Sequence, residues 1–321
     1  MQKRFLHKII LLFAALVAGT TFPQVNARGD IYVANFALNR SAQYTIGQYT
    51  NAGATVNASL ISSGLFRPNG LALSGSDLFV SNSSTGTIGK YTIAGATENP
   101  VLISGLSFPI CMAISGSNLF VVNSDSGTIG EYTTSGQTVN ANLVSGLPHA
   151  PGAGFPVGLA LDTTGSNLFV SDYDSGTVGE YTTSGAVVNA ALISGLKSPV
   201  GLAVSGSSLF VIDTASGTVR EYTISGAVVN ASLISGLPTT ASRLFVFGSD
   251  LFISNSNGVI SEYTTSGDLV NPSLITGLNE PSDIIVTPEP GSAALIAVAG
   301  LGLLLRRSRK GRSLNTPGPT L

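Results

Sequence analysis

The chain has 321 residues, of which 43% are hydrophobic, only 10% are charged and 38 are glycine. This composition excludes an intrinsically disordered chain, which has few apolar and many charged residues. The length suits one large all-β domain or two average domains. The single cysteine, Cys111, excludes an intrachain disulfide, and we interpret it as a small buried residue.

Charge is distributed unevenly along the chain, although the formal net charge is only −2. Residues 28–286 hold seven basic against sixteen acidic side chains, whereas both ends of the chain are basic. A body this acidic argues against nucleic acid as a partner, because phosphate binding needs clustered Lys and Arg. The basic ends flank apolar runs, which indicates a membrane topology instead.

Residues 1–27 have the three parts of a secretory signal peptide. An apolar core at residues 9–19 (IILLFAALVAG) is followed by small residues at 25–27. The positive start consists of Lys3, Arg4 and Lys8. The apolar run is short for a membrane span, which needs about 20 residues. We therefore expect export through the inner membrane, with an uncleaved anchor or a core helix as the alternative.

Residues 28–286 repeat one pattern six times. Each copy has an apolar strand such as LFVID, a turn rich in Ser, Gly and Thr, and a strand ending in Glu-Tyr-Thr or a close variant. The copies begin at Ile31, Leu78, Leu119, Leu168, Leu209 and Leu251. Their spacing is 41 or 42 residues, apart from gaps of 47 and 49 that contain insertions. A period near 40 with four short strands per unit is typical of a β-propeller.

The fifth copy shows all four expected strands, which are separated by turns containing Gly and Ser. They are predicted at residues 200–204, 209–212, 218–223 and 231–235. The first strand consists mostly of small residues, as crowding around a central axis requires. The larger residues of the other strands are expected to fill the wider, outer part of each blade.

The two ends of the repeat array predict how the ring closes. The first copy begins at Asp30 and lacks a first strand, whereas residues 281–286 (PSDIIV) form a first strand without a blade. Placing this C-terminal strand (residues 283–287) beside Ile31 completes the first blade and removes the open edges of a linear array. The sequence therefore predicts an all-β fold, a six-bladed β-propeller over residues 28–287, with four-stranded antiparallel blades and one composite blade.

The repeats are similar to those of a known class of propeller. The pattern P-x-G-L-A-V, followed by L-F-V-x-D/N, a turn and a strand ending E-Y-T, resembles the NHL-type repeats of six-bladed β-propellers. The resemblance covers essentially all of residues 28–286. One such repeat is a weak signal, but six in register are a strong one.

The C-terminal region, residues 288–312, resembles the PEP-CTERM sorting signal of Gram-negative bacteria that produce exopolysaccharide. An apolar stretch at about 292–305, expected to form a short transmembrane helix, lies between a Pro-Glu-Pro motif and a basic cluster. The motif residues are Pro288, Glu289, Pro290, Arg306 and Arg307. The prolines favour an extended segment that a processing enzyme can grip, and the arginines keep the tail cytoplasmic.

The PEP-CTERM resemblance implies a partner and a destination. An exosortase-like sorting enzyme is expected to recognise the signal, so that the protein is transiently anchored in the membrane and then reaches the cell envelope or the extracellular matrix. An ordinary tail anchor is the alternative. The tail at 313–321 extends further than is usual in the family.

Two polar positions recur in every copy, and we interpret both as structural. The residue that ends the second strand is always Asn or Asp, and a turn follows in which its side chain can accept a backbone N–H. The tyrosine of the third strand is expected to pack between blades. The two sets are Asn35, Asn82, Asn123, Asp172, Asp213 and Asn255, and Tyr49, Tyr91, Tyr132, Tyr181, Tyr222 and Tyr263.

Candidate binding residues lie in the loops where the copies differ. The loops from fourth to first strand and from second to third strand are expected on one face. Aromatic and charged residues on that face suit a sugar polymer or a protein strand; ordinary solvated loops are the alternative. The candidates are Phe66, Arg67, Phe108, His149, Phe155, Tyr173, Asp174 and Lys197, and the same loops are expected to hold Asp125, Arg243 and Glu280.

Signatures of an enzyme are scarce. His149 is the one histidine outside the signal peptide, and alone it cannot form a catalytic triad. No Cys/His cluster has the spacing of a zinc site. Six-bladed lactonases of the gluconolactonase type hold a metal at the central channel with acidic and Asn ligands. The first strands here offer mainly Gly, Ala and Leu, with Asp283 and Asn69 as polar candidates.

These observations favour a non-enzymatic, exported interaction module without a cofactor. Its expected partner is exopolysaccharide or another surface protein. Two alternatives stay open: a metal-dependent hydrolase or lyase with its site in the central channel, and a purely structural matrix component.

Overall fold

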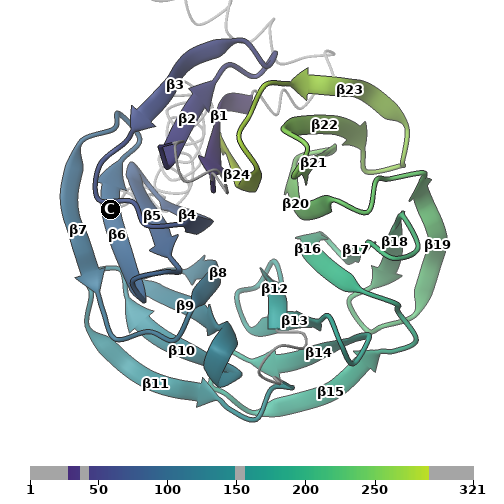
Figure 1. Cartoon of the computed structure of the whole chain (residues 1–321). Coiled ribbons are helices and arrows are strands. Elements are labelled where there is room, and N and C mark those ends of the chain that lie inside the picture. The colour runs from purple at the N-terminus through teal and green to yellow at the C-terminus, as the bar shows by residue number, and fades with distance from the viewer. Residues whose placement is uncertain (1–27, 37–42, 149–155, 289–321) are drawn as a thin grey trace, which may run out of the picture. The chain divides into compact units, whose positions relative to one another are not determined.

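The computed structural model describes residues 28–36, 43–148 and 156–288. In these ranges, 24 strands form six antiparallel sheets of four strands each. Figure 1 shows the six sheets arranged as blades around a central axis. The predicted fold, an all-β six-bladed propeller, is therefore confirmed.

The strands of each blade are given from the central axis outward. Blade 1 contains β24 (Pro281–Pro288), β1 (Arg28–Asn35), β2 (Thr45–Tyr49) and β3 (Thr55–Ile61). Blade 2 contains β4 (Pro68–Ser74), β5 (Asp77–Asn82), β6 (Thr87–Thr92) and β7 (Thr97–Ile103). Blade 3 contains β8 (Pro109–Ser115), β9 (Asn118–Asn123), β10 (Thr128–Thr133) and β11 (Thr138–Val144), with a 3-10 turn at Ser124–Ser126.

The other three blades follow the same plan. Blade 4 contains β12 (Pro156–Leu161), β13 (Asn167–Asp172), β14 (Thr177–Thr182) and β15 (Val187–Ile193). Blade 5 contains β16 (Pro199–Ser205), β17 (Ser208–Asp213), β18 (Thr218–Thr223) and β19 (Val228–Ser235). Blade 6 contains β20 (Ala241–Phe247), β21 (Asp250–Asn255), β22 (Val259–Thr264) and β23 (Leu269–Ile275).

The composite blade forms as predicted. β24 pairs antiparallel with β1, and Val286 lies opposite Ile31 while Ile284 lies opposite Val33. β24 begins two residues earlier than the predicted 283–287 strand and ends one residue later, at Pro288. The first proline of the predicted sorting motif is thus the last residue of the propeller.

Small residues in the innermost strands allow neighbouring blades to approach closely. A Cβ atom on Gly70 would lie 2.1 Å from the carbonyl oxygen of Ile110 in the next blade, a distance that no side chain tolerates. The small residues of the predicted first strand therefore follow from the narrow centre of the ring.

The hydrophobic core lies between blades, and the repeated tyrosines are part of it. Tyr91 of blade 2 is fully buried in a cluster that includes Ala34 and Ile46 of blade 1. Its hydroxyl donates a hydrogen bond to the carbonyl of Gly64, 3.0 Å away, in the loop that joins the two blades. The interpretation of these tyrosines as packing residues is confirmed at this position.

Each outermost strand has a free edge, and a repeated asparagine modifies that edge. In β3, the side chain of Asn57 accepts the backbone N–H of Ser59 at 3.1 Å, beside a shift in the pairing register. The equivalent bonds recur in the outer strands of the other five blades. Because an irregular edge with an occupied N–H is a poor template for another strand, this motif opposes edge-to-edge aggregation.

Several predictions concern residues that lie outside the described ranges. These are the signal peptide at 1–27, the candidates His149 and Phe155, the motif residues Glu289, Pro290, Arg306 and Arg307, the apolar stretch at about 292–305 and the tail at 313–321. Within the described ranges, no helix has both the length and the apolar character of a membrane span.

Candidate functional site

The loops from fourth to first strand and from second to third strand meet on one face of the ring. Arg67 and Phe108, which lie in loops of the first type, border the same surface pocket as Asp125 and residues 83–86, which lie in loops of the second type. The predicted sharing of one face by the two loop types is therefore confirmed here. We call this face the rim face.

A cluster of aromatic residues surrounds one arginine on the rim face. The guanidinium carbon of Arg67 lies 4.4 Å from the centroid of the Phe36 ring and 6.0 Å from that of Phe108. Both distances are within the range of attractive cation–π contacts. Phe66 precedes Arg67, and its side chain is 51% exposed. We call Phe36, Phe66, Arg67 and Phe108 the rim cluster.

Sequence reasoning predicted three members of the rim cluster but missed Phe36. Phe36 directly follows Asn35, at a position where the other copies have Ser83, Ser124, Tyr173, Thr214 and Ser256. A disagreement between copies at this position was the signal that could have found it. The contact itself depends on Arg67, which lies 31 residues further along the chain, in the loop between β3 and β4.

The backbone beneath the rim cluster has an unusual conformation. Arg67 and Phe108 have φ angles of 55° and 53°, and Glu280, at the equivalent place between blades 6 and 1, has a φ of 52°. Each precedes a proline. A left-handed conformation is uncommon for a residue other than glycine, and strain of this kind persists only where the surroundings enforce it.

Hydrogen bonds from the next blade hold these three residues in place. The carbonyl of Arg67 accepts bonds from the backbone N–H and the hydroxyl of Ser83, at 3.2 and 2.9 Å. The carbonyls of Phe108 and Glu280 accept the N–H groups of Ser124 and Phe36, at 3.2 and 3.1 Å. The strained positions are thus fixed to the ends of neighbouring second strands, which pre-organises the side chains above them.

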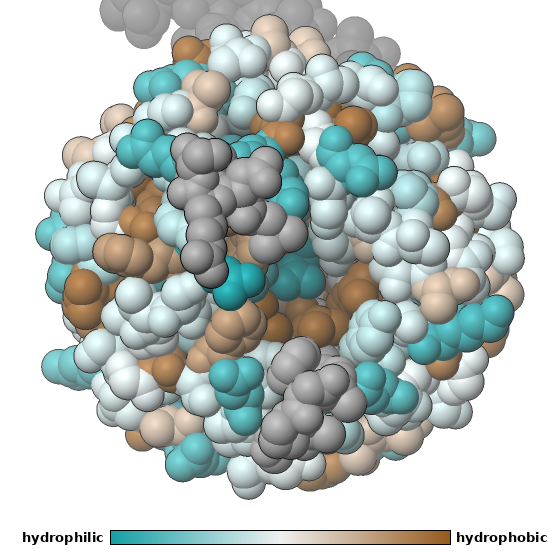
Figure 2. All heavy atoms as spheres, viewed as in Figure 1, coloured by the Kyte–Doolittle hydropathy of each residue, from teal (hydrophilic) through white to brown (hydrophobic). Residues whose placement is uncertain are grey.

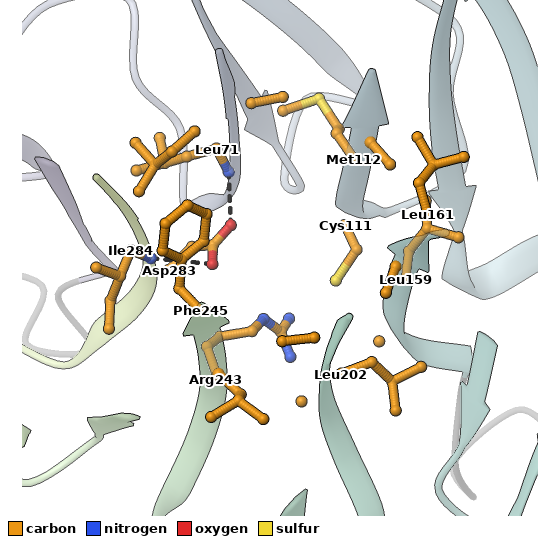
Figure 3. Close-up of a pocket in the computed structure, with 18 of the residues that line it drawn as sticks. Leu71, Cys111, Met112, Leu159, Leu161, Leu202, Arg243, Phe245, Asp283 and Ile284 are labelled. Carbon is orange, nitrogen blue, oxygen red and sulfur yellow. Dashed lines mark hydrogen bonds between the residues drawn. The ribbon is translucent and has the colours of Figure 1, made fainter. Parts of the chain in front are cut away.

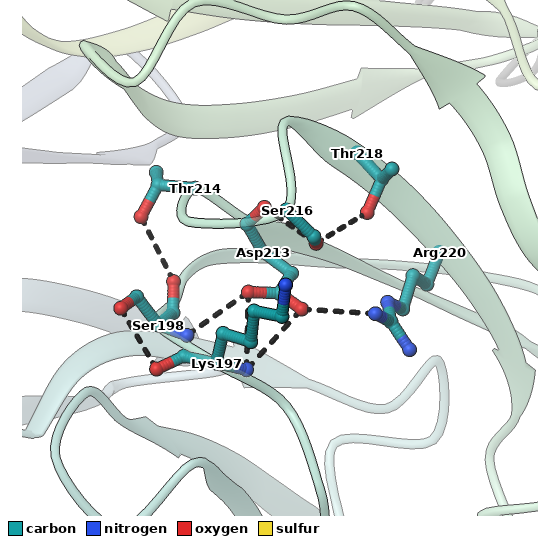
Figure 4. Close-up of polar contacts among 7 residues, drawn as sticks. All are labelled: Lys197, Ser198, Asp213, Thr214, Ser216, Thr218 and Arg220. Carbon is teal, nitrogen blue, oxygen red and sulfur yellow. Dashed lines mark hydrogen bonds and ion pairs between the residues drawn. The ribbon is translucent and has the colours of Figure 1, made fainter.

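The repeated Asx residues support the loops of the rim face, because their side chains accept backbone N–H groups from these loops. Asp213 is fully buried at the end of β17, and its carboxylate accepts the N–H of Ser198 at 2.9 Å and that of Lys197 at 3.2 Å (Figure 4). It also pairs with Arg220 at 3.1 Å. In blade 2, Asn82 accepts the N–H of Phe66 at 2.9 Å.

The structure refines the predicted role of these residues. The expectation was that each side chain bonds the turn that follows it, and Asp172 does so through the N–H of Ser175 at 2.7 Å. Asn82 and Asp213 instead bond loop residues about one strand pair earlier in the chain. They are structural, as predicted, but they support the rim loops rather than their own turn.

The predicted candidates Tyr173, Asp174 and Lys197 have exposed side chains in blade 4 and in the loop that leads to blade 5. Within the described ranges, the structure shows no contact between them and the rim cluster. The candidates therefore divide into one assembled group, around Arg67, and three separate exposed side chains.

The second concave feature is the central channel, a cavity of about 330 Å³ lined by the innermost strands of blades 2–6 and by β24. Figure 2 shows the centre of the ring hollowed, with hydrophobic residues along the lower right of the hollow and hydrophilic residues at its upper side. Most lining residues are Leu, Ile, Val and Ala, and the polar or titratable exceptions are Cys111, Arg243 and Asp283. The expectation that Cys111 is a small buried residue is confirmed, and Asp283 faces the channel as predicted.

The expected position of Arg243 was wrong. We expected it in a loop on the rim, but it is the third residue of β20 and lines the channel (Figure 3). The reason is that blade 6 lacks the proline that starts the other innermost strands, so that its first strand, ASRLFVF, is not recognised from the pattern. Alignment of Ser242-Arg243-Leu244 with Val200-Gly201-Leu202 would have found it.

The three side chains differ in how they are bonded. The carboxylate oxygens of Asp283 accept the backbone N–H groups of Leu71 and Ile284, at 2.7 and 2.9 Å. The thiol of Cys111 donates to the carbonyl of Val157 at 2.9 Å. Arg243 donates one long bond, 3.4 Å, to the side chain of Asn69, and its Nε has no partner.

Burial in the channel raises the pKa values of two side chains, Asp283 and Cys111. Burial raises the pKa of Asp283 to about 6, although Arg243 and the two backbone N–H groups act to lower it. Burial also raises the pKa of the Cys111 thiol. At neutral pH the cysteine is therefore a neutral thiol, and Asp283 titrates close to the physiological range.

The donor set does not suit a metal ion. Within the described ranges, no three His, Cys, Asp or Glu residues come together as ligands. Asn69 and Asp283, the predicted polar candidates, both lie near the guanidinium of Arg243, and the two carboxylate oxygens of Asp283 already accept hydrogen bonds. The positive charge of Arg243 repels a cation at this position.

Comparisons with known proteins place the fold. No family model and no curated protein matches the sequence. Solved structures do match, and the first is a chain in a crystal structure of a nidogen/laminin complex, with a TM-score of 0.67, 14% identity, and coverage of 81% of this chain and 98% of that chain.

Two enzymes have similar structures. A putative 6-phosphogluconolactonase from Bacteroides uniformis matches with a TM-score of 0.62 and 14% identity, covering 81% of this chain and 99% of that chain. Virginiamycin B lyase from Staphylococcus aureus matches with a TM-score of 0.52 and 17% identity, covering 76% and 77%. At such low identities the likeness concerns the fold alone, which binding proteins and enzymes share: the chain is an all-β, six-bladed propeller.

Proposed function

We propose that the chain is an exported, NHL-like propeller that acts as a non-enzymatic interaction module at the cell surface or in the extracellular matrix, where the rim cluster binds exopolysaccharide. The observation that carries this proposal is that Arg67, at a strained backbone position on an accessible face, lies within cation–π distance of two phenylalanine rings. Strained backbone positions are common at ligand-binding sites, which supports a binding role for the side chains of Arg67 and Phe108.

The chemistry of the rim cluster suits a carbohydrate. The exposed ring of Phe66 offers a flat apolar surface on which the C–H face of a sugar can stack, and the guanidinium of Arg67 can donate hydrogen bonds to hydroxyl groups. The neighbouring pocket adds hydroxyl groups from Ser83, Ser84 and Thr85. A mixture of aromatic faces and small polar groups is typical of surfaces that recognise polar ligands.

Binding at the rim cluster is tested with two variants of the full-length chain. In affinity electrophoresis against exopolysaccharide from the host bacterium, Phe66→Ala and Arg67→Ala are each expected to weaken binding about tenfold, which corresponds to about 1.4 kcal/mol. Tyr173→Ala is the matched control, because it removes an exposed aromatic side chain that does not contact the cluster. Retention of wild-type affinity by both rim variants would refute the proposal, provided that circular dichroism shows both to be folded.

The proposed destination rests on the PEP-CTERM resemblance and is tested separately. Because Pro288 is the last residue of β24, the deletion should begin at residue 289 so that the ring stays complete. Removing residues 289–312 is expected to shift the protein from the envelope and matrix fractions to the periplasm, as measured by cell fractionation. Removing only residues 313–321 is the control, and an unchanged location after the larger deletion would contradict the sorting hypothesis.

A metal-dependent hydrolase or lyase in the central channel is disfavoured by the charge of Arg243. The two enzymes with similar structures show that the fold admits catalysis, but fold alone does not assign it.

A further inference from the structure

The polar side chains of the central channel lie in one layer, which is formed by the third residue of each innermost strand. The third residue of each innermost strand is Gly in blades 2, 4 and 5, at Gly70, Gly158 and Gly201. In the other three blades the same position holds Cys111, Arg243 and Asp283. The layer lies near the start of these strands, which is the end of the channel next to the rim face. At the three glycines the backbone of the neighbouring blade comes close, so the polar side chains of this layer come from the other three blades.

Arg243 is the incompletely bonded member of this layer. A guanidinium has five N–H donors, yet among the described residues the side chain of Arg243 makes only the 3.4 Å bond to Asn69, and its buried Nε has no partner there. In Figure 3 the guanidinium points into the middle of the cavity. A donor that is shielded from water and has no acceptor is costly, so a native structure that contains one calls for an explanation.

Asp283 does not satisfy Arg243. Its two carboxylate oxygens are directed to the backbone N–H groups of Leu71 and Ile284, and within the described ranges no ion pair joins it to Arg243. Among the residues that the structure describes, no carboxylate pairs with this guanidinium, so a carboxylate ligand could do so. A planar guanidinium suits a carboxylate in particular, because two parallel N–H groups can bond both oxygens.

The rest of the cavity suits a hydrocarbon. Its walls include Leu71, Met112, Leu159, Leu202 and Phe245, and its volume of about 330 Å³ is at the lower end of the range for small-molecule pockets. Cys111, Arg243 and Asp283 are the polar or titratable side chains among the described lining residues, so a sugar acid with several hydroxyl groups would find few side-chain partners there. An inorganic anion would leave the walls unused.

We propose that the central channel binds a small monocarboxylate with an apolar body, whose carboxylate pairs with Arg243 while its hydrocarbon part lies against the leucines of the innermost strands. This site is separate from the rim cluster. Its test is therefore independent of the test of the proposed interaction with exopolysaccharide.

The titratable groups that face the cavity predict how binding depends on pH. They are Cys111, Arg243 and Asp283. Cys111 stays neutral between pH 5.5 and 7.5, because burial raises the pKa of its thiol. Asp283, with a pKa of about 6, is mostly neutral at pH 5.5 and mostly charged at pH 7.5, where it repels a second carboxylate. Affinity is therefore expected to fall about tenfold over this range, since each unit of pKa change on binding corresponds to a factor of ten.

The test is a calorimetric titration of the full-length chain with sodium hexanoate at pH 5.5 and 7.5. We expect saturable binding at one site, at least about tenfold weaker in Arg243→Gln and unchanged in the control Lys90→Gln, which removes a cation that pairs with Asp77 and Glu98 instead. Acetate and inorganic phosphate are expected to bind at least about tenfold more weakly than hexanoate, because they bury little apolar surface.

A second variant keeps the test decisive if Arg243→Gln is unstable. Asp283→Asn removes the competing charge, so hexanoate should bind about tenfold more tightly than to wild type at pH 7.5 and with little dependence on pH. The proposal is overturned if the folded wild type does not bind hexanoate, if acetate or phosphate binds as tightly, or if Asp283→Asn retains the wild-type affinity and pH dependence.

Discussion

A chain that ends at Glu280 is expected to lose the cooperative unfolding transition of the propeller. The truncation removes β24, which contributes the buried residues Ile284, Ile285 and Val286 to the interfaces of blade 1 with its neighbours. Burial of each such side chain contributes about 1.5–3 kcal/mol, so that the loss approaches the 5–15 kcal/mol by which whole domains are stable. It also leaves the edge of β1 open to other chains.

Thermal unfolding followed by circular dichroism, together with size-exclusion chromatography, measures this effect. The control ends at Pro290 and keeps all 24 strands. We expect a sharp transition and a monodisperse peak for the control, and a broad transition with aggregation for the shorter chain. A chain ending at Glu280 that unfolds as sharply as the control would show that closure through β24 is not needed for stability.

Replacing Asp213 with alanine is expected to destabilise the fold by about 3–5 kcal/mol, the usual effect of breaking a buried ion pair. The substitution removes the acceptor of the Lys197 and Ser198 N–H groups and leaves Arg220 without its partner. Asp213→Asn is the matched variant, because blade 2 already has Asn82 at this position. It keeps one acceptor and should cost less, about 1–2 kcal/mol. Chemical denaturation of the three proteins measures both differences.

The pH dependence of these variants separates charge from packing. Burial alone would raise the pKa of Asp213, but the N–H groups of Ser198 and Lys197, the hydroxyl of Ser216 and the guanidinium of Arg220 together hold the pKa below its ordinary value. The stability that the charge contributes is therefore present above the pKa of the unfolded chain and is lost as the pH falls through the lower folded value. The advantage of wild type over Asp213→Asn should shrink at acid pH, and an advantage that is constant from pH 7 to pH 3 would show that the charge contributes nothing.

The local sequence pattern was sufficient to predict the architecture of the propeller. The alternation of apolar residues, the glycines at turns and the period near 40 residues each act within one blade, so they can be read from neighbouring residues in the chain. Ring closure could also be predicted, because the first copy lacks a first strand and the unpaired last strand can supply it. Strand ends were less certain: the outer strand of blade 5 begins at Val228 rather than at 231, because a shift in register lets the strand resume pairing before Asn230.

The sequence by itself determined the fold, the closing strand and the structural role of the repeated Asx and Tyr residues. Only the tertiary structure decided where the chemistry gathers. Asn69, Arg243 and Asp283 are up to about 214 residues apart, and they meet because ring closure brings the first residues of the innermost strands to one axis. Phe36 and Arg67 likewise meet only when blades 1 and 2 stand side by side. Contacts of this kind depend on the angle between blades, and no periodicity within a blade records that angle.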